Sequence, residues 1–75
     1  MRCRLYLNIG LLYDKHNPSM SLEYLEKARA RSKELRDWHT LHLTLTQLVE
    51  THTRQNEFNQ ALRYADQVNL VKKYK

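Results

Sequence analysis

Hydrophobic residues recur at three- and four-residue steps along the chain, which is the spacing that places them on one side of an α-helix. Four segments follow this pattern, over residues of about 2–15, 18–35, 38–54 and 57–74. In the first segment the apolar stripe consists of Leu5, Tyr6, Ile9, Leu12 and Tyr13. Because the connections are short, consecutive helices are expected to pack antiparallel. The pattern predicts an all-α fold with four helices.

Residues that end or begin helices separate the four segments. Asn17 is expected to cap the second helix, with Pro18 in its first turn, and Asp37 to cap the third. Asn56 tolerates the left-handed backbone that ends a helix and also suits the cap of the fourth. Phe58 is expected to fill the space beside this last turn as an apolar plug.

The helical pattern occurs twice, with a period of 39 to 40 residues. The equivalent pairs are Tyr6 and Leu45, Ile9 and Leu48, Gly10 and Val49, Tyr13 and His52, Ser21 and Ala61, and Ala28 and Val68. Gly10 inside a helix costs about 1 kcal/mol relative to Ala, so we expect a close helix contact there in compensation. The period predicts two helical hairpins, over residues of about 2–36 and 37–75.

The order of large and small residues resembles the tetratricopeptide repeat (TPR). Tyr6, Ile9, Gly10 and Tyr13 are large, large, small and large, and the second helix follows with small, large and small residues at positions 21, 25 and 28. The resemblance implies antiparallel helix pairs in a right-handed TPR-type α-solenoid, of which the 75 residues are a single segment. The sequence departs from the family pattern in two ways: its period is longer, and the terminal proline of each repeat is missing.

A narrower resemblance lies at the start of the chain. Met1 and Arg2, followed by residues 4–11 (RLYLNIGL), look like a repeat of the Tonsoku-like proteins, which are nuclear scaffolds of replication-fork repair. Similar strings occur in other arrays with this period, such as the Pins-type polarity adaptors. The resemblance implies an excerpt of a longer array that binds partner proteins, inside the cell, in the nucleus if the Tonsoku-like likeness holds and otherwise in the cytoplasm.

By resemblance to the TPR family, the first helix of each hairpin lines the concave surface of the solenoid. Ten residues are expected to contact a protein or peptide partner there: Arg4, Leu7, Asn8, Leu11, Lys15, Leu43, Thr46, Gln47, Glu50 and Arg54. Apolar strips flanked by charges suit an extended or helical peptide. The alternative is that these residues contact neighbouring repeats.

Composition leaves two other interactions open. The chain carries 13 Lys and Arg against 8 Asp and Glu, a formal net charge of +5, which permits binding to nucleic acid without requiring it. The basic residues that would form an outer face for phosphates are Arg29, Arg36, Arg63, Lys72, Lys73 and Lys75. Self-association through exposed apolar ends is a further alternative. The pattern contains no membrane-spanning run.

Residues that carry chemistry do not form a recognisable site. His39 and His42 are three residues apart, but two ligands are too few for a structural metal site. His52 stands at a stripe position and is expected to be a core ring. Cys3 has no base at a known spacing, and a lone cysteine fits a reducing intracellular compartment. We therefore expect a scaffold rather than an enzyme, with no cofactor or metal.

Overall fold

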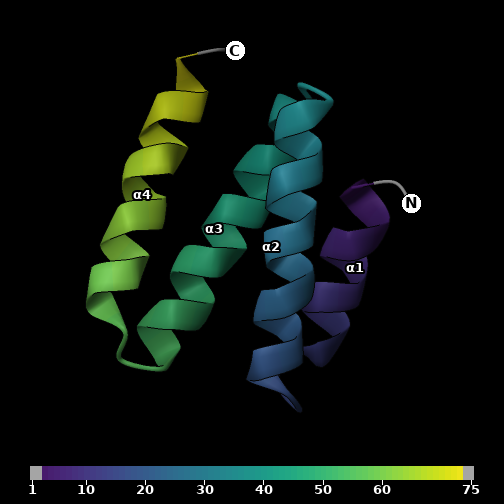
Figure 1. Ribbon diagram of the computed structural model, residues 1–75. Helices are drawn as coiled ribbons and strands as arrows, with labels where there is room; N and C mark the ends of the chain where they lie inside the picture. The colour runs from purple at the N-terminus through teal and green to yellow at the C-terminus, as the bar shows by residue number, and fades with distance from the viewer. Residues whose placement is uncertain (1–2, 74–75) are drawn as a thin grey trace.

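Four α-helices make up the computed structural model, which describes residues 3–73 (Figure 1). They are α1 (Cys3–Tyr13), α2 (Pro18–Glu34), α3 (Trp38–Arg54) and α4 (Phe58–Lys72). No strand occurs in the described residues, so the all-α, four-helix prediction is confirmed. The predicted helix limits at residues 2 and 74, and Lys75 of the basic set, lie outside the described part of the chain.

The helices form two hairpins that lie side by side in a thin slab. Figure 1 shows consecutive helices running in opposite directions, with α2 and α3 at the junction of the hairpins. The helix α1 packs on α2, α3 packs on α2 and α4, and a smaller contact joins α1 to α3. The extents of 31 × 27 × 12 Å correspond to this arrangement of helices in a shallow layer. One broad core therefore has to serve all four helices.

Side-chain caps begin the second and third helices, as predicted. The Asn17 Oδ1 accepts a hydrogen bond of 3.2 Å from the Met20 N–H, and Pro18 follows at the first position of α2. Asp37 accepts 3.2 Å and 2.7 Å bonds from the N–H and hydroxyl of Thr40. These bonds satisfy N–H groups that have no partner within their own helix. Both predicted caps are confirmed.

Left-handed residues end α2 and α3. Arg36 has a φ of 55° and Asn56 a φ of 61°, and the next N–H after each returns to a carbonyl five residues back, from Asp37 to Ser32 at 2.9 Å and from Glu57 to His52 at 2.8 Å. This is the Schellman arrangement. The prediction for Asn56 as a helix end is confirmed, whereas the left-handed Arg36 went unrecognised because it is neither Gly nor Asn.

Two predictions about the start of α4 are wrong. Glu57, and not Asn56, occupies the N-cap position, and its side chain makes no cap hydrogen bond. Phe58 is 57% exposed and Leu62 is 64% exposed, so the expected apolar plug is absent. Both side chains lie on the same side of α4 because they are four residues apart, and the helix packs on α3 through a different side, where Ala61 is buried.

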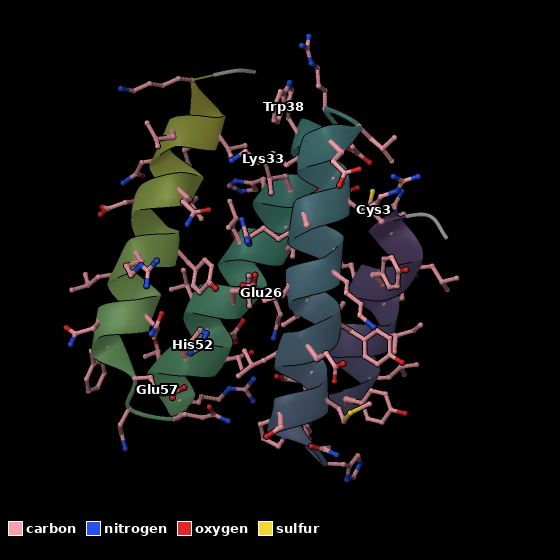
Figure 2. The ribbon with its side chains drawn as sticks, viewed as in Figure 1. Cys3, Glu26, Lys33, Trp38, His52 and Glu57 are labelled. Carbon is pink, nitrogen blue, oxygen red and sulfur yellow. The ribbon has the colours of Figure 1, made fainter. Side chains whose placement is uncertain are left out.

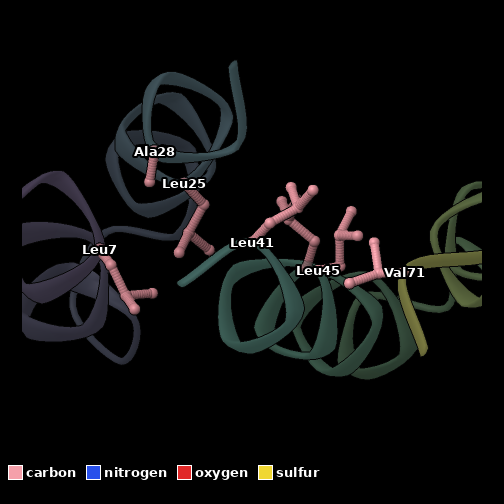
Figure 3. Close-up of a cluster of buried hydrophobic side chains, with 7 residues drawn as sticks. Leu7, Leu25, Ala28, Leu41, Leu45 and Val71 are labelled. Atoms are coloured by element: carbon pink, nitrogen blue, oxygen red, sulfur yellow. The ribbon is translucent and has the colours of Figure 1, made fainter. Parts of the chain in front are cut away.

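The hydrophobic core runs from α1 through α2 and α3 to α4 (Figure 3). Leu25, Leu45 and Leu48 are its most enclosed side chains, and burying a leucine fully contributes about 1.5–3 kcal/mol. The remaining members of the buried cluster are Leu7, Ala28, Leu41 and Val71. Some hydroxyl groups buried beside it bond within their own helix, as where the Thr44 Oγ1 donates to the Thr40 carbonyl at 2.8 Å, whereas those of Ser21 and Thr51 bond to Gly10 and Asp14 of the first hairpin. The core is therefore continuous across both hairpins.

The buried side of α1 differs from the predicted stripe. Cys3, Leu7 and Gly10 are its buried residues, whereas Leu5 is 46% and Leu12 is 78% exposed. The three buried positions are separated by four and three residues, so they form a helical face of their own. The predicted stripe mixed two faces because α1 has apolar residues on several sides.

The closest approach of α1 and α2 lies at Gly10, as expected. The Ser21 Oγ donates a 2.7 Å hydrogen bond to the Gly10 carbonyl. A Cβ atom on Gly10 would lie 2.9 Å from the Leu25 Cγ and 3.3 Å from the Ser21 carbonyl oxygen. Since Leu25 is completely buried, it has little room to move away. Any other residue at this position would require a shift of the Leu25 side chain or of one helix.

A stacked pair of rings lies near the turn of each hairpin. Tyr13 stacks on Tyr24 with ring centroids 6.0 Å apart and planes 9° apart. His52 stacks on Tyr64 at 5.5 Å and 13°, and the His52 Nδ1 also lies 2.9 Å from the Glu57 Oε1. The expectation that His52 acts as a packed ring is met, since its side chain is only 12% exposed.

The Tyr64 hydroxyl connects α4 to α2 by donating a hydrogen bond to Glu26. Burial and this carboxylate raise the pKa of Tyr64 from 10.0 to about 12. Glu26 also receives a 3.0 Å hydrogen bond from Arg29 of its own helix. The two hairpins are therefore joined by a polar link in addition to the apolar core.

We predict that Gly10→Ala destabilises the fold by about 1–2 kcal/mol, although Ala is intrinsically the better helix former by about 1 kcal/mol. The reason is the collision with Leu25 and Ser21. Urea unfolding followed by far-ultraviolet circular dichroism measures the difference. Asn8→Ala, on the exposed side of α1, is the control and should leave the stability unchanged or raised. Equal stability of the two variants would contradict the close contact.

We predict that Tyr64→Phe lowers the free energy of unfolding by about 1 kcal/mol at neutral pH, because the hydrogen bond to Glu26 is lost. The pKa of Tyr64 is higher in the folded chain, so this advantage over the variant is complete below pH 10 and is lost as the pH rises through about 12. Tyr13→Phe is the matched control, since its ring is stacked but the described residues give its hydroxyl no hydrogen bond. A similar effect of both variants would count against the link.

Candidate functional site

The helices α1 and α3, which the sequence analysis assigned to partner binding, are joined at Asp14. This residue directly follows α1, and its Oδ2 lies 2.5 Å from the Arg54 Nη2 at the end of α3. Its Oδ1 accepts a 3.1 Å hydrogen bond from the Thr51 hydroxyl. Thr51 is buried, and the Asp14 side chain is only 15% exposed. The three residues fix the ends of α1 and α3 next to each other.

The Arg54 guanidinium and the Thr51 hydroxyl favour the ionised form of the Asp14 carboxylate. The hydrogen bond from Arg54 is the main cause that lowers the pKa of Asp14 below its usual 3.8, against the raising effect of burial; the Thr51 hydroxyl lowers it further. The same hydrogen bond raises the pKa of Arg54. Because Arg54 is 47% exposed, solvent screens part of the attraction. The junction is a positioned ion pair at the edge of the surface that the sequence predicts to bind a partner.

Most of the ten residues assigned to the concave surface are accessible. Gln47 is half-buried and donates a 3.5 Å hydrogen bond to the Thr51 hydroxyl. Leu11 is 44% and Leu43 is 39% exposed, so both present apolar surface to solvent. The other exposed members of the set are Arg4, Asn8, Lys15, Thr46, Glu50 and Arg54. Their role in binding stays a prediction.

Leu7 is the exception and requires a correction. It is only 5% exposed and belongs to the buried cluster with Leu25 and Leu41 (Figure 3). Its position follows from the buried face of α1, on which it lies between Cys3 and Gly10. A side chain enclosed in this way cannot contact a partner without unfolding the core. Leu7 is therefore a core residue and not a surface residue.

A hollow of about 310 Å³ lies beside the junction. It brings together two of the predicted residues, Lys15 and Arg54, with Asp14 and Thr51. Thr51 was missed at the sequence level because a buried hydroxyl on a helix has no distinctive spacing. Two cations and one carboxylate give the hollow a formal charge of +1, which suits a carboxylate of a bound peptide.

Other candidate chemistry does not assemble in the described residues. Within residues 3–73 no group of three His, Cys, Asp or Glu side chains is placed to hold a metal ion. Cys3, at the start of α1 (Figure 2), is buried, and its thiol lies 3.5 Å from the Asp37 Oδ2. Within the same range, no helix has the length and apolar character needed to cross a membrane.

Several basic side chains of α2 are neutralised by neighbouring acids on the same helix. Lys27 lies 4.0 Å from Glu23, and Arg31 lies 3.0 Å from Glu34. Arg29, which belongs to the basic set considered for phosphate binding, pairs with Glu26 at 3.0 Å. Pairs of this kind reduce the field that a phosphate backbone would meet on this helix.

Comparison of the chain with protein-family models, with curated proteins and with solved structures gives no match.

We predict that Asp14→Asn lowers the free energy of unfolding by about 1 kcal/mol at neutral pH, after allowance for solvent screening of the exposed Arg54. The pKa of Asp14 is lowered in the folded chain, so its contribution is present above pH 3.8 and is lost as the pH falls through the lowered value. Urea unfolding at several pH values measures it.

The control for this prediction is Asp66→Asn. Asp66 is exposed on α4, and the described residues give it no ion pair. The free energy of unfolding of Asp66→Asn should equal that of the unmodified chain at neutral pH, and the difference between the two should not change as the pH falls. A difference between Asp14→Asn and the unmodified chain that persists unchanged at low pH would exclude the ion pair as its source.

Proposed function

We propose that the chain is a segment of a TPR-type helical-repeat array and binds a protein partner through the surface formed by α1 and α3. The observation that carries the proposal is the duplicated ring stack. Tyr13 and His52 are 39 positions apart, Tyr24 and Tyr64 are 40 apart, and each pair stacks within its own hairpin. The period of 39 to 40 residues therefore relates the ring stacks as well as the hydrophobic positions, which supports two copies of one hairpin.

The exposed leucines of α1 also support an array. Leu5 and Leu12 lie 39 positions before Thr44 and Thr51. Both threonines are buried, and Thr51 bonds to Asp14 of the first hairpin. The corresponding side of α1 is apolar and exposed, so it is suited to pack on a preceding hairpin as α3 packs on the first. Isolated repeats of this kind cannot bury their apolar faces alone.

The chemistry of the α1 and α3 surface favours a peptide with both apolar and charged side chains. Leu11 and Leu43 supply apolar contact area, since they are 44% and 39% exposed. Lys15, Arg54 and Glu50 supply charges of both signs around them. An amphipathic helix or an extended segment with alternating side chains would match such a surface.

The setting we propose follows the resemblance of residues 1–11 to Tonsoku-like repeats, namely a nuclear scaffold of replication-fork repair. A cytoplasmic adaptor is the corresponding setting if that likeness fails. Nucleic-acid binding through an outer basic face has less support, because Arg29 is paired with Glu26 and Lys27 with Glu23. Self-association remains the alternative favoured by the exposure of Leu12.

The test compares proteins captured by the immobilised chain with those captured by Leu11→Arg. We expect the variant to capture at least about tenfold less of each partner, because a charge in the centre of an apolar contact weakens binding. Leu35→Arg is the matched control, since Leu35 is 54% exposed at the end of α2 and is not among the ten residues assigned to partner binding. Quantitative mass spectrometry of nuclear and cytoplasmic extracts measures capture, and circular dichroism verifies the fold.

Partners that bind Leu11→Arg as well as the unmodified chain would place the binding surface elsewhere. Equal losses with Leu35→Arg would indicate a general effect of added charge. Sedimentation of the chain alone addresses self-association, which predicts a mass that rises with concentration.

A further inference from the structure

A second hollow lies on another part of the molecule, between α2, α3 and α4. Its volume is about 150 Å³. Trp38, Leu41 and Leu45 line it from the first half of α3, and Leu70 and Val71 line it from the end of α4. A space of this size accepts a group on the order of one benzene ring. None of the ten residues assigned to partner binding lines it, so the site differs from the surface proposed above.

The crossing of α3 and α4 produces this hollow. Figure 1 shows α3 running obliquely from the base of α4 toward the top of α2, so that the end of α4 stands away from the start of α3. Lower down, the Tyr64 hydroxyl bonds to Glu26 and holds α4 and α2 together. Above this link the apolar side chains are incompletely covered, and Leu70 is 54% exposed. The hollow is a feature of the helix crossing and not of one loose side chain.

The rim of the hollow is positively charged. Arg29 and Lys33 line it from α2, Gln67 lines it from α4, and no acidic residue takes part in the lining. Glu26 pairs with Arg29 at 3.0 Å, whereas Lys33 is exposed and the described residues give it no ion pair. Figure 2 shows Lys33 and Trp38 at the same end of the molecule. One cation next to an apolar floor is therefore left for an occupant.

We propose that this hollow binds an acidic peptide segment, enclosing one phenylalanine side chain and pairing a neighbouring carboxylate with Lys33. The apolar floor and the volume account for the ring. The uncompensated cation accounts for the acid, because complementary charge selects among partners of similar shape. Ligand sites in proteins commonly combine an apolar lining with a few polar groups in this way.

Three acetylated and amidated peptides test the proposal. The first has one phenylalanine flanked on each side by two glutamates, the second has glutamines in place of the glutamates, and the third has alanine in place of phenylalanine. Trp38 is the single tryptophan of the chain and lines the hollow, so its fluorescence reports binding there. The acidic phenylalanine peptide should give a saturable change, the glutamine peptide about fivefold weaker binding, and the alanine peptide no saturable change.

Two variants with matched controls locate the site. Lys33→Gln and Leu70→Ala should each weaken binding of the acidic phenylalanine peptide about three- to fivefold. Lys27→Gln makes the same charge change on α2, and Leu62→Ala the same truncation on α4, at positions that do not line the hollow. Both controls should bind as the unmodified chain does, and circular dichroism verifies that all four variants fold.

Unchanged binding in Lys33→Gln and Leu70→Ala would overturn the proposal, as would equal losses in the two controls. Equal affinity for the glutamate and glutamine peptides would show that charge plays no part and would also overturn it. Two further results would assign the hollow to other occupants and likewise overturn it. One is a Trp38 emission that changes on concentration-dependent dimerisation of the chain, and the other is displacement of the peptide by a short oligonucleotide.

Discussion

The separation of α1 and α2 at Gly10 is the constraint on which the rest of the structure depends. With no side chain at this position, the Ser21 hydroxyl reaches the Gly10 carbonyl at 2.7 Å and Leu25 lies directly against the helix. Leu25 is at the centre of the core, where it joins Leu41 and Leu45 of α3. A larger separation of the first hairpin would therefore move the surface on which the second hairpin packs.

The existence and order of the helices follow from the sequence because local signals agree. Periodic apolar residues define the four segments, and Asn17, Asp37 and Asn56 each stand where a helix has to begin or end. The faces of a helix are harder to assign when apolar residues surround it. In α1 the exposed Leu12 and the buried Leu7 are both leucines, and only the positions of the neighbouring helices distinguish them.

The candidate sites were less predictable than the helices. Asp14 and Arg54 are 40 residues apart, and their ion pair depends on the relative position of α1 and α3. Of the leucines that the resemblance to a repeat family assigned to the partner-binding surface, Leu11 and Leu43 are exposed, whereas Leu7 is buried in the core. The hollow between α3 and α4 depends on a crossing angle, which hydrophobic spacing does not specify.

The two hairpins are unequally supported, and this difference connects stability with binding. The helix α4 packs mainly on α3 and reaches α2 through the Tyr64 hydroxyl, and of its described residues only Ala61 and Val71 are buried. Elements with few buried contacts open at lower free energy than the core, so α4 should separate before α1 and α2 do. An occupant of the hollow would contact α2, α3 and α4 together, and any ligand that binds only the closed arrangement stabilises it by mass action. The hydrogen bond from Tyr64 to Glu26 and such an occupant would then stabilise the same state, in which α4 is packed at the angle that leaves the hollow open.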